Sequence, residues 1–238
     1  MNVYGISDLH LSFGVNKPMD IFGSKWKNYE EKVKENWNSV ALDGDVIIIP
    51  GDISWGMTFK ETVKDFEFIN KLKGNKIILK GNHDYYFSTK TKVNNFLNEN
   101  GFNTIKVLYN DAIDTEKYII CGTRGWGKTE SKDKELEKKI IRREEGRLRI
   151  SLDKGMEIKT SYLEKGIDKD ILVAMHFPPF TGNFKNILEE YKVKKCIYGH
   201  LHGFAHSLIK EGMIEEAFTI IKAIRDRYDG YKRCPWSE

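Results

Sequence analysis

Short apolar runs without polar interruption constrain the fold of this chain more than any other feature. Residues 46–49 are all β-branched, which is typical of a strand that is covered on both faces. Residues 171–175 form a second uninterrupted apolar run. Segments with helical periodicity lie between such runs. The sequence therefore predicts an α/β fold in which parallel strands are joined by right-handed crossovers.

The predicted helices are marked by their end signals. Thr58 followed by Glu61 has the spacing of a capping box, and an apolar stripe follows it. Residues 24–40 and 88–100 are also predicted to be helical, and Gly101 ends the second of these helices. The charged stretch 133–152 is predicted to be a helix whose paired charges face solvent, in preference to a patch that binds nucleic acid.

Composition limits the possible partners and the compartment. The 238 residues carry a net charge of +4, which suits an anionic substrate and makes nucleic acid an unlikely partner. We find no apolar stretch long enough to cross a membrane and no signal peptide, so no membrane partner is expected. The three cysteines form no CxxC pair, and Cys121 and Cys196 lie in strand-like runs that predict buried thiols, which indicates a cytoplasmic protein. Composition leaves the oligomeric state open.

Side chains that bind metal ions follow most of the predicted strands. Carboxylates, an amide and imidazoles at strand ends make a mixed oxygen and nitrogen metal site. Ligands bind beyond the carboxyl ends of the strands in sheets of this type. Seven such residues are enough for two metals that share a ligand. The seven candidate metal ligands are Asp8, His10, Asp52, Asn82, His176, His200 and His202.

Each of these motifs is weak by itself. Asp52 has the position of a helix N-cap, and a lone histidine is usually a structural polar residue. Three further residues are candidates for catalysis. His83 can transfer a proton, and Asp84 can orient its ring. Arg124, in a glycine-flanked loop, could clamp a phosphate or could be structural.

The order DxH, GD, GNHD, H and GHxH over residues 1 to about 203 resembles the calcineurin-like metallophosphoesterase superfamily, in particular a bacterial branch of predicted phosphohydrolases. The resemblance implies a four-layer α/β/β/α sandwich. It also implies that Asp52 bridges two metals. The first metal is then bound by Asp8, His10, Asp52 and His202. The second is bound by Asp52, Asn82, His176 and His200.

The resemblance implies hydrolysis of a phosphomonoester or phosphodiester by in-line attack of a metal-bridging hydroxide. His83 would stabilise the charge on the phosphate or protonate the leaving oxygen, with Asp84 holding its ring. The donor types suggest manganese, iron or zinc. The phosphorylated substrate is of unknown class. The sequence Gly51-Asp52-Ile53-Ser54-Trp55 lacks the arginine of the serine/threonine protein phosphatases, which argues against that branch.

Two alternatives remain open. Residues Gly122 to Thr129 fit the P-loop pattern GxxxxGK[ST], which would indicate a nucleoside triphosphatase. Against it, Trp126 stands where backbone amides should wrap a phosphate, and no later strand ends in a suitable aspartate. The second alternative is a non-catalytic metallophosphoesterase remnant that binds metal weakly.

The end of the chain departs from the pattern. We divide it into a metallophosphoesterase domain at 1–212 and an atypical helical tail at 213–238, a division that would leave the second sheet incomplete at its C-terminal end. The tail sequence RDRYDG with a later PW resembles a C-terminal segment of family 116 glycoside hydrolases, although Cys234 replaces the asparagine expected there. The similarity covers fewer than thirty residues and brings no complete sugar site, so we expect no glycosidase activity.

Overall fold

The computed structural model describes residues 1–23, 26–127 and 133–201. Its first sheet consists of four parallel strands. Its order is β1 (Val3–Gly5), β2 (Val46–Ile49), β3 (Asn75–Ile78) and β4 (Ile105–Val107), and every pairing is parallel. Parallel pairing follows from the helical crossovers that the sequence predicts. The carboxyl ends of these strands therefore share one edge of the sheet.

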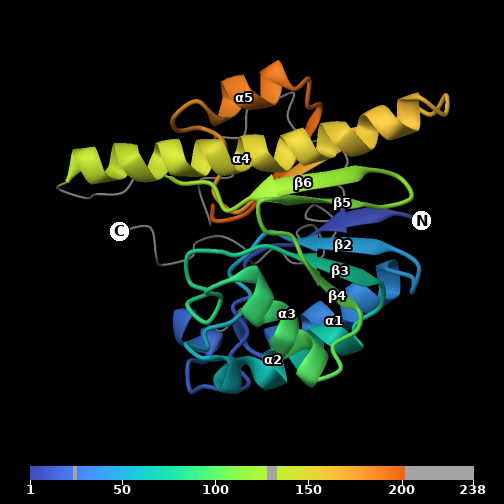
Figure 1. Cartoon of the computed structure of the whole chain (residues 1–238). Helices are drawn as coiled ribbons and strands as arrows, with labels where there is room; N and C mark the ends of the chain where they lie inside the picture. Colours follow the sequence, from blue (N-terminus) through green and yellow to red (C-terminus); the bar gives the residue numbers. More distant parts are fainter. Residues whose placement is uncertain (24–25, 128–132, 202–238) are drawn as a thin grey trace.

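Three helices cover the outer face of this sheet (Figure 1). They are α1 (Tyr29–Val40), α2 (Phe59–Lys71) and α3 (Lys90–Glu99), and a short 3-10 helix, η1 (Met19–Phe22), precedes α1. The predicted capping box is confirmed, because Thr58 accepts from the backbone of Glu61 and the Glu61 carboxylate accepts from Thr58. This fixes the start of α2 directly after the loop that leaves β2.

The second sheet has the order β5 (Asp111–Asp114), β6 (Ile119–Thr123), β7 (Ile171–Met175) and β8 (Lys195–Tyr198). β5 is antiparallel to β6, and the other pairings are parallel. Two helices, α4 (Lys134–Leu163) and α5 (Phe184–Glu190), lie on its outer face. The described residues thus form the predicted four-layer α/β/β/α sandwich.

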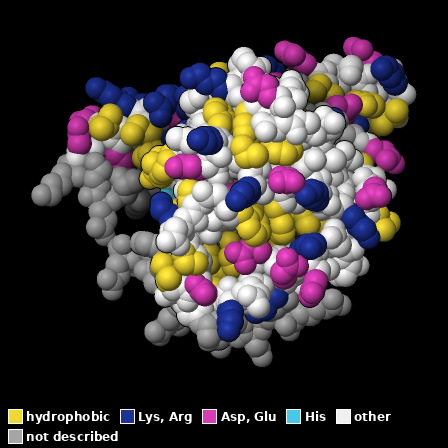
Figure 2. Space-filling model, turned by 90° about the horizontal axis from the view of Figure 1, so that it is seen from below, with side chains coloured by type: hydrophobic (Ala, Val, Ile, Leu, Met, Phe, Trp, Pro, Cys, Tyr) yellow, Lys and Arg dark blue, Asp and Glu magenta, His cyan; other side chains and the backbone are white. Residues whose placement is uncertain are grey.

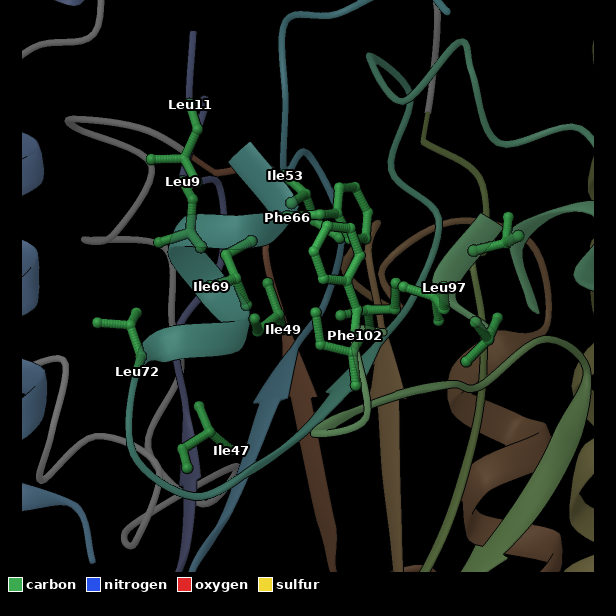
Figure 3. Close-up of a cluster of buried hydrophobic side chains, with 14 of the residues drawn as sticks. Leu9, Leu11, Ile47, Ile49, Ile53, Phe66, Ile69, Leu72, Leu97 and Phe102 are labelled. Atoms are coloured by element: carbon green, nitrogen blue, oxygen red, sulfur yellow. The ribbon is translucent and has the colours of Figure 1, made fainter. Parts of the chain in front are cut away.

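The alternation of β2 shows how the layers are held together. Ile47 and Ile49 pack under the first helices (Figure 3), while Val46 and Ile48 point to the second sheet. Burial on both faces explains why the strand has no polar residue. Leu172 of β7 meets the inner face from the opposite sheet, so the apolar layer between the two sheets is continuous.

Helix α4 differs from the prediction in length. It extends to Leu163, and one of its faces is buried against β6. A β-carbon at Gly155 would collide with Cys121, so the helix approaches the strand closely. The sequence predicted the solvent-facing charges of this helix, and the position of α4 over the sheet decides which of its other faces is buried. The buried residues of α4 are Glu144, Leu148, Ser151, Leu152 and Gly155.

The two described cysteines, Cys121 and Cys196, are buried free thiols, as predicted. Burial raises the pKa of each to about 12, so neither is reactive near neutral pH. Within residues 1–23, 26–127 and 133–201, every helix is too short or too polar to serve as a membrane span. The predicted tail at 213–238 and its domain boundary lie outside the described residues.

Candidate metal centre

The loops that follow β1 and β2 run side by side beyond the carboxyl edge of the first sheet. The backbone N–H of Asp8 donates to Gly51 at 3.1 Å, and that of His10 donates to Asp52 at 3.0 Å. Leu11 and Ser54 then form an isolated parallel bridge. Main-chain bonding between the loops brings the first two motifs together, although they are more than forty residues apart in sequence.

Four candidate ligands have left-handed backbone conformations. The φ angles are 58° for Asp8, 47° for His10, 52° for Asp52 and 69° for His200. This region is unfavourable for residues with a β-carbon, and it costs of order 1–3 kcal/mol at each position. The backbone strain at these four residues lowers the stability of the fold. It also sets the direction in which the four side chains point.

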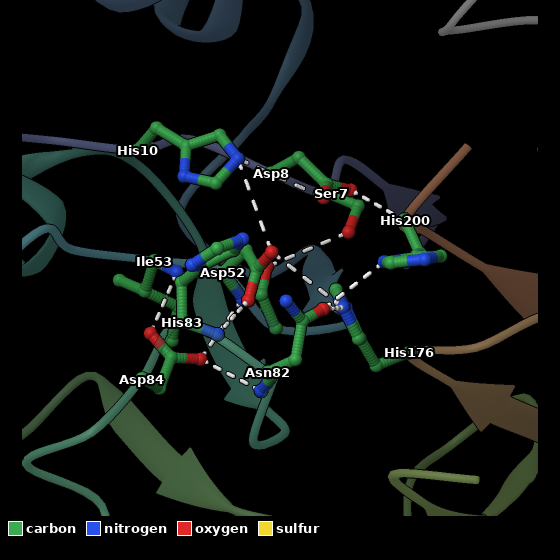
Figure 4. Close-up of polar contacts among 12 residues, drawn as sticks. Ser7, Asp8, His10, Asp52, Ile53, Asn82, His83, Asp84, His176 and His200 are labelled. Atoms are coloured by element: carbon green, nitrogen blue, oxygen red, sulfur yellow. Dashed lines mark hydrogen bonds and ion pairs between the residues drawn. The ribbon is translucent and has the colours of Figure 1, made fainter. Parts of the chain in front are cut away.

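The side chains converge in two groups that share one carboxylate (Figure 4). His10 Nε2 lies 3.9 Å from Asp8 Oδ1 and 3.9 Å from Asp52 Oδ2. His176 Nε2 lies 3.5 Å from the same Asp52 oxygen. The groups are Asp8, His10 and Asp52, and Asp52, His176 and His200, and the ligand atoms within each lie within 4.8 Å of one another.

The amide of Asn82 completes the second group. Its Oδ1 lies 2.6 Å from His176 Nε2 and 3.0 Å from His200 Nδ1. His176 Nδ1 lies 2.9 Å from the carbonyl of Pro50, which can only accept, so Nδ1 carries the proton. In a neutral ring, Nε2 then turns a lone pair toward the amide oxygen. A cation between these atoms would satisfy both of them, so the donor set fits a metal.

The electrostatics of the pocket point the same way. Asp52 is 1% exposed, and its carboxylate lies near two other acidic groups. Burial, followed by the charges of Asp84 and Asp8, raises the pKa of Asp52 to about 9. Oxygen and nitrogen donors without a thiolate suit divalent manganese, iron or zinc. The residues present therefore fit the divalent metals that the sequence suggests.

Asp84 makes contacts other than the expected one. Its carboxylate is fully buried and accepts from the backbone N–H groups of Asp52, Ile53 and Gly81 at 2.7–2.8 Å. It also accepts from the hydroxyl of Tyr86 at 3.1 Å. These bonds fasten the loop after β3 to the loop after β2. They hold the backbone of Asp52 in place and do not involve the His83 ring.

Aromatic neighbours surround the ring of His83. The ring of Trp55 lies 4.9 Å away and that of His10 5.8 Å away. Trp55 also stacks on His10 at 4.5 Å with an interplanar angle of 18°. The backbone N–H of His83 donates to Asp52 Oδ1 at 2.8 Å. Trp55 was missed in the sequence analysis, and its only signal was its position three residues after Asp52.

Arg124 begins the loop after β6, and its carbonyl accepts from the backbone of His176 at 3.1 Å. Its guanidinium lies 3.6 Å from the carboxylate of Glu144 and 4.8 Å from the ring of Trp126. Glu144 was not expected to take part in a site, because the sequence shows it only as one charge in a charged helix. The side chain of Arg124 is therefore directed toward α4.

The glycines of the P-loop pattern have packing roles in the described part of that segment. Gly122 lies inside β6, where a β-carbon would collide with the carbonyl of Ala174. Gly125 has a φ of +70°, and Gly127 lies close to the ring of Phe177. Lys128 and Thr129 lie outside the described residues, as does His202. Close packing explains these glycines without a bound nucleotide.

A paired-sheet sandwich with histidine and carboxylate ligands at the strand ends defines a metal-binding α/β protein. The sequence profile of the calcineurin-like phosphoesterases matches residues 1–204. The chain belongs to this family. The family supports hydrolysis of phosphoesters and binding of divalent metals, and it confirms the resemblance found in the sequence. A search of curated proteins gave no match.

Several solved structures are similar over most of the chain. A protein of unknown function from Aquifex aeolicus is 17% identical, with 82% of this chain and 88% of that one covered and a TM-score of 0.39. A phosphopantetheinyl hydrolase from Mycobacterium tuberculosis is 15% identical, with coverages of 84% and 82% and a TM-score of 0.43. A Thermus thermophilus protein is 12% identical, with coverages of 82% and 80% and a TM-score of 0.47.

Proposed function

We propose that this chain is a dinuclear metal-dependent phosphoesterase that hydrolyses a phosphomonoester or phosphodiester. The observation that supports the proposal best is that Asp52 belongs to both groups of candidate ligands. A carboxylate has two oxygens and can hold two cations a few ångströms apart. When bound, such a pair supplies an activated water near neutral pH and neutralises phosphate oxygens for in-line displacement.

The proposed ligand sets follow the two groups. We assign Asp8, His10 and Asp52 to the first metal, and the family pattern adds His202. The second metal is assigned to Asp52, Asn82, His176 and His200. The Pro50 carbonyl fixes the tautomer of His176 so that Nε2 faces the site. Manganese, iron and zinc are the candidate ions.

His83 is the proposed acid of the reaction. Its ring lies beside the first ligand group, next to His10 and Trp55. An imidazole in this place can protonate the leaving oxygen or stabilise charge that develops on the phosphate. Its backbone N–H holds one oxygen of Asp52, so this residue also helps to orient the shared carboxylate.

The partner is proposed to be a phosphorylated substrate. On the face seen in Figure 2, Lys and Arg side chains are interspersed with Asp and Glu, and this mixture offers no continuous track for a nucleic-acid backbone. The two buried free thiols also support the proposed cytoplasmic location.

The test is metal reconstitution of stripped protein, with p-nitrophenyl phosphate and bis-p-nitrophenyl phosphate as substrates. We expect activity to return with manganese, iron or zinc as two ions bind per chain. Asp52→Asn has nearly the same shape without the charge, and we expect it to reduce hydrolysis to background and the metal content to one ion or fewer.

Full activity with a single bound ion would contradict the dinuclear assignment. Two bound ions without hydrolysis of either ester would favour the non-catalytic remnant. Tight ATP binding that Lys128→Ala abolishes would favour the nucleoside triphosphatase instead.

A further inference from the structure

A buried carboxylate collects arginine side chains beside the metal centre. Glu144 of α4 is 0% exposed, and a single oxygen of its side chain meets three guanidinium groups. Nitrogen atoms of Arg147, Arg143 and Arg124 lie 2.6, 3.3 and 3.6 Å from Oε1. The other oxygen accepts from the hydroxyl of Thr123 at 3.4 Å. We refer to Arg124, Arg143 and Arg147 as the arginine cluster.

The arginine cluster carries more positive charge than Glu144 can neutralise. Burial lowers the pKa of Arg124, and the charges of Arg143 and Arg147 lower it further while Glu144 opposes them. Cations gathered in this way are stabilised by an anion that binds between them.

Nearby carboxylates have other partners. Glu145, the next residue of α4, accepts from the backbone of Asn183 at 2.6 Å, on the side of α5. Asp111 forms ion pairs with Lys90 and Lys154. Among the described residues, Glu144 is thus the carboxylate that forms ion pairs with Arg124, Arg143 and Arg147.

The arginine cluster adjoins the metal centre through a chain of ring contacts. The Arg124 guanidinium lies over Trp126 at 4.8 Å, and the Trp126 ring lies 5.6 Å from Phe177. Phe177 in turn lies 4.3 Å from the ring of His200. The backbone of Arg124 is hydrogen-bonded to that of His176. The arginine cluster is therefore connected to the second ligand group by one row of contacting rings.

Trp126 provides an independent sign of a ligand. Its indole N–H is buried and meets no acceptor among residues 1–23, 26–127 and 133–201. Buried donors in proteins are nearly always paired. Because the ring lies against Arg124, an anion held by the cluster would be within reach of this donor as well.

We propose that the arginine cluster binds a second phosphate group of the substrate, next to the phosphate that is hydrolysed. Arginine forks recognise phosphate oxygens in bidentate fashion, and Glu144 arranges the forks before the substrate arrives. This inference rests on the proposed phosphoesterase activity and narrows it to compounds with two phosphate groups. Arg143 and Arg147 are then specificity residues contributed by α4.

The test compares three nucleotides that differ in their phosphates. Adenosine monophosphate has one, adenosine diphosphate has two adjacent ones, and adenosine bisphosphate carries the second on the ribose. We expect the metal-loaded protein to have a KM at least about tenfold lower for one of the two-phosphate compounds than for the monophosphate. Arg143→Ala and Arg147→Ala should each reduce this preference about tenfold, which corresponds to one charge-assisted contact.

Arg142→Ala is the matched control, since Arg142 is an exposed neighbour on the same helix and of the same charge. It should leave the preference unchanged. Arg143 is the safer test of the cluster, because its side chain is already 54% exposed and its loss leaves two guanidiniums on Glu144. Melting temperatures of all variants identify any loss of folding.

Equal KM values for the three nucleotides would overturn the inference, and so would a preference that survives both substitutions in folded protein. If no ester is hydrolysed at all, the proposed function fails instead. Calorimetric titration of adenosine diphosphate and monophosphate into the metal-loaded protein then still tests the cluster. Binding that is equal for the two, or unaffected by Arg143→Ala, rejects it.

Discussion

Asp84 and Glu144 are both fully buried carboxylates near the carboxyl edge of a sheet, yet their surroundings differ. Asp84 accepts from backbone N–H groups and a tyrosine hydroxyl, all of which are neutral donors. Glu144 is surrounded by guanidinium groups and a threonine hydroxyl. The first arrangement fastens main chain to main chain, and the second gathers charged side chains.

This difference indicates the role of each buried carboxylate in the site. Removing the Asp84 charge would leave rigid N–H donors in the interior, where water cannot replace the acceptor. The partners of Glu144 can turn outward, because the Arg143 and Arg147 side chains are 54% and 31% exposed. Asp84 therefore supports the ligand loops, whereas Glu144 supports a surface that can exchange partners with a ligand.

The largest expected effect is that of His83→Ala, and it tests whether His83 is the acid of the reaction beside the loops that Asp84 supports. Because the contacts of Asp84 lie elsewhere than the His83 ring, we expect His83 to act with its ring placed by Trp55 and His10. Turnover should fall by about 10²–10⁴-fold through loss of acid catalysis, with full metal content. Steady-state kinetics and metal analysis measure both. A loss of bound metal would reassign His83 as a ligand.

Asp84→Asn should mainly reduce stability. The amide nitrogen of asparagine must face at least two of the N–H donors that the carboxylate accepts from, and each unpaired buried group costs about 1–3 kcal/mol. We expect a loss of about 3 kcal/mol or more in urea unfolding. The exposed Asp168→Asn is the control and should change stability by about 1 kcal/mol or less, because it removes only a surface ion pair with Lys159. Unchanged stability with a loss of turnover as large as that of His83→Ala would restore the ring-orienting role expected from sequence.

Glu144→Gln should give the smallest change, about 2 kcal/mol in the same unfolding measurement, which is typical of one hydrogen bond to a charged group. The Arg143 and Arg147 side chains can reach solvent after the substitution, so of the three guanidinium groups only the largely buried one of Arg124 loses its charge partner in the interior. If Glu144→Gln costs as much as Asp84→Asn, the two carboxylates play the same supporting role and the contrast between them is lost.

The sequence alone determined the class of fold and most of the candidate ligands. Strand periodicity, the capping box at Thr58 and the residues at strand ends are local properties. In parallel sheets they place ligands at one edge regardless of the details of packing. This is why the sequence predicts six ligands that the structure brings together, namely Asp8, His10, Asp52, Asn82, His176 and His200.

Tertiary structure decided what depends on the neighbour across a layer. β5 (Asp111–Asp114) has two charged ends and was not predicted, because it is a strand only through its pairing with β6. The role of Asp84 and the burial of Glu144 were invisible for the same reason. The sequence shows that a carboxylate is present but does not show its partners. Its function depends on the hydrogen-bond donors that the fold brings to it from residues far away in the chain.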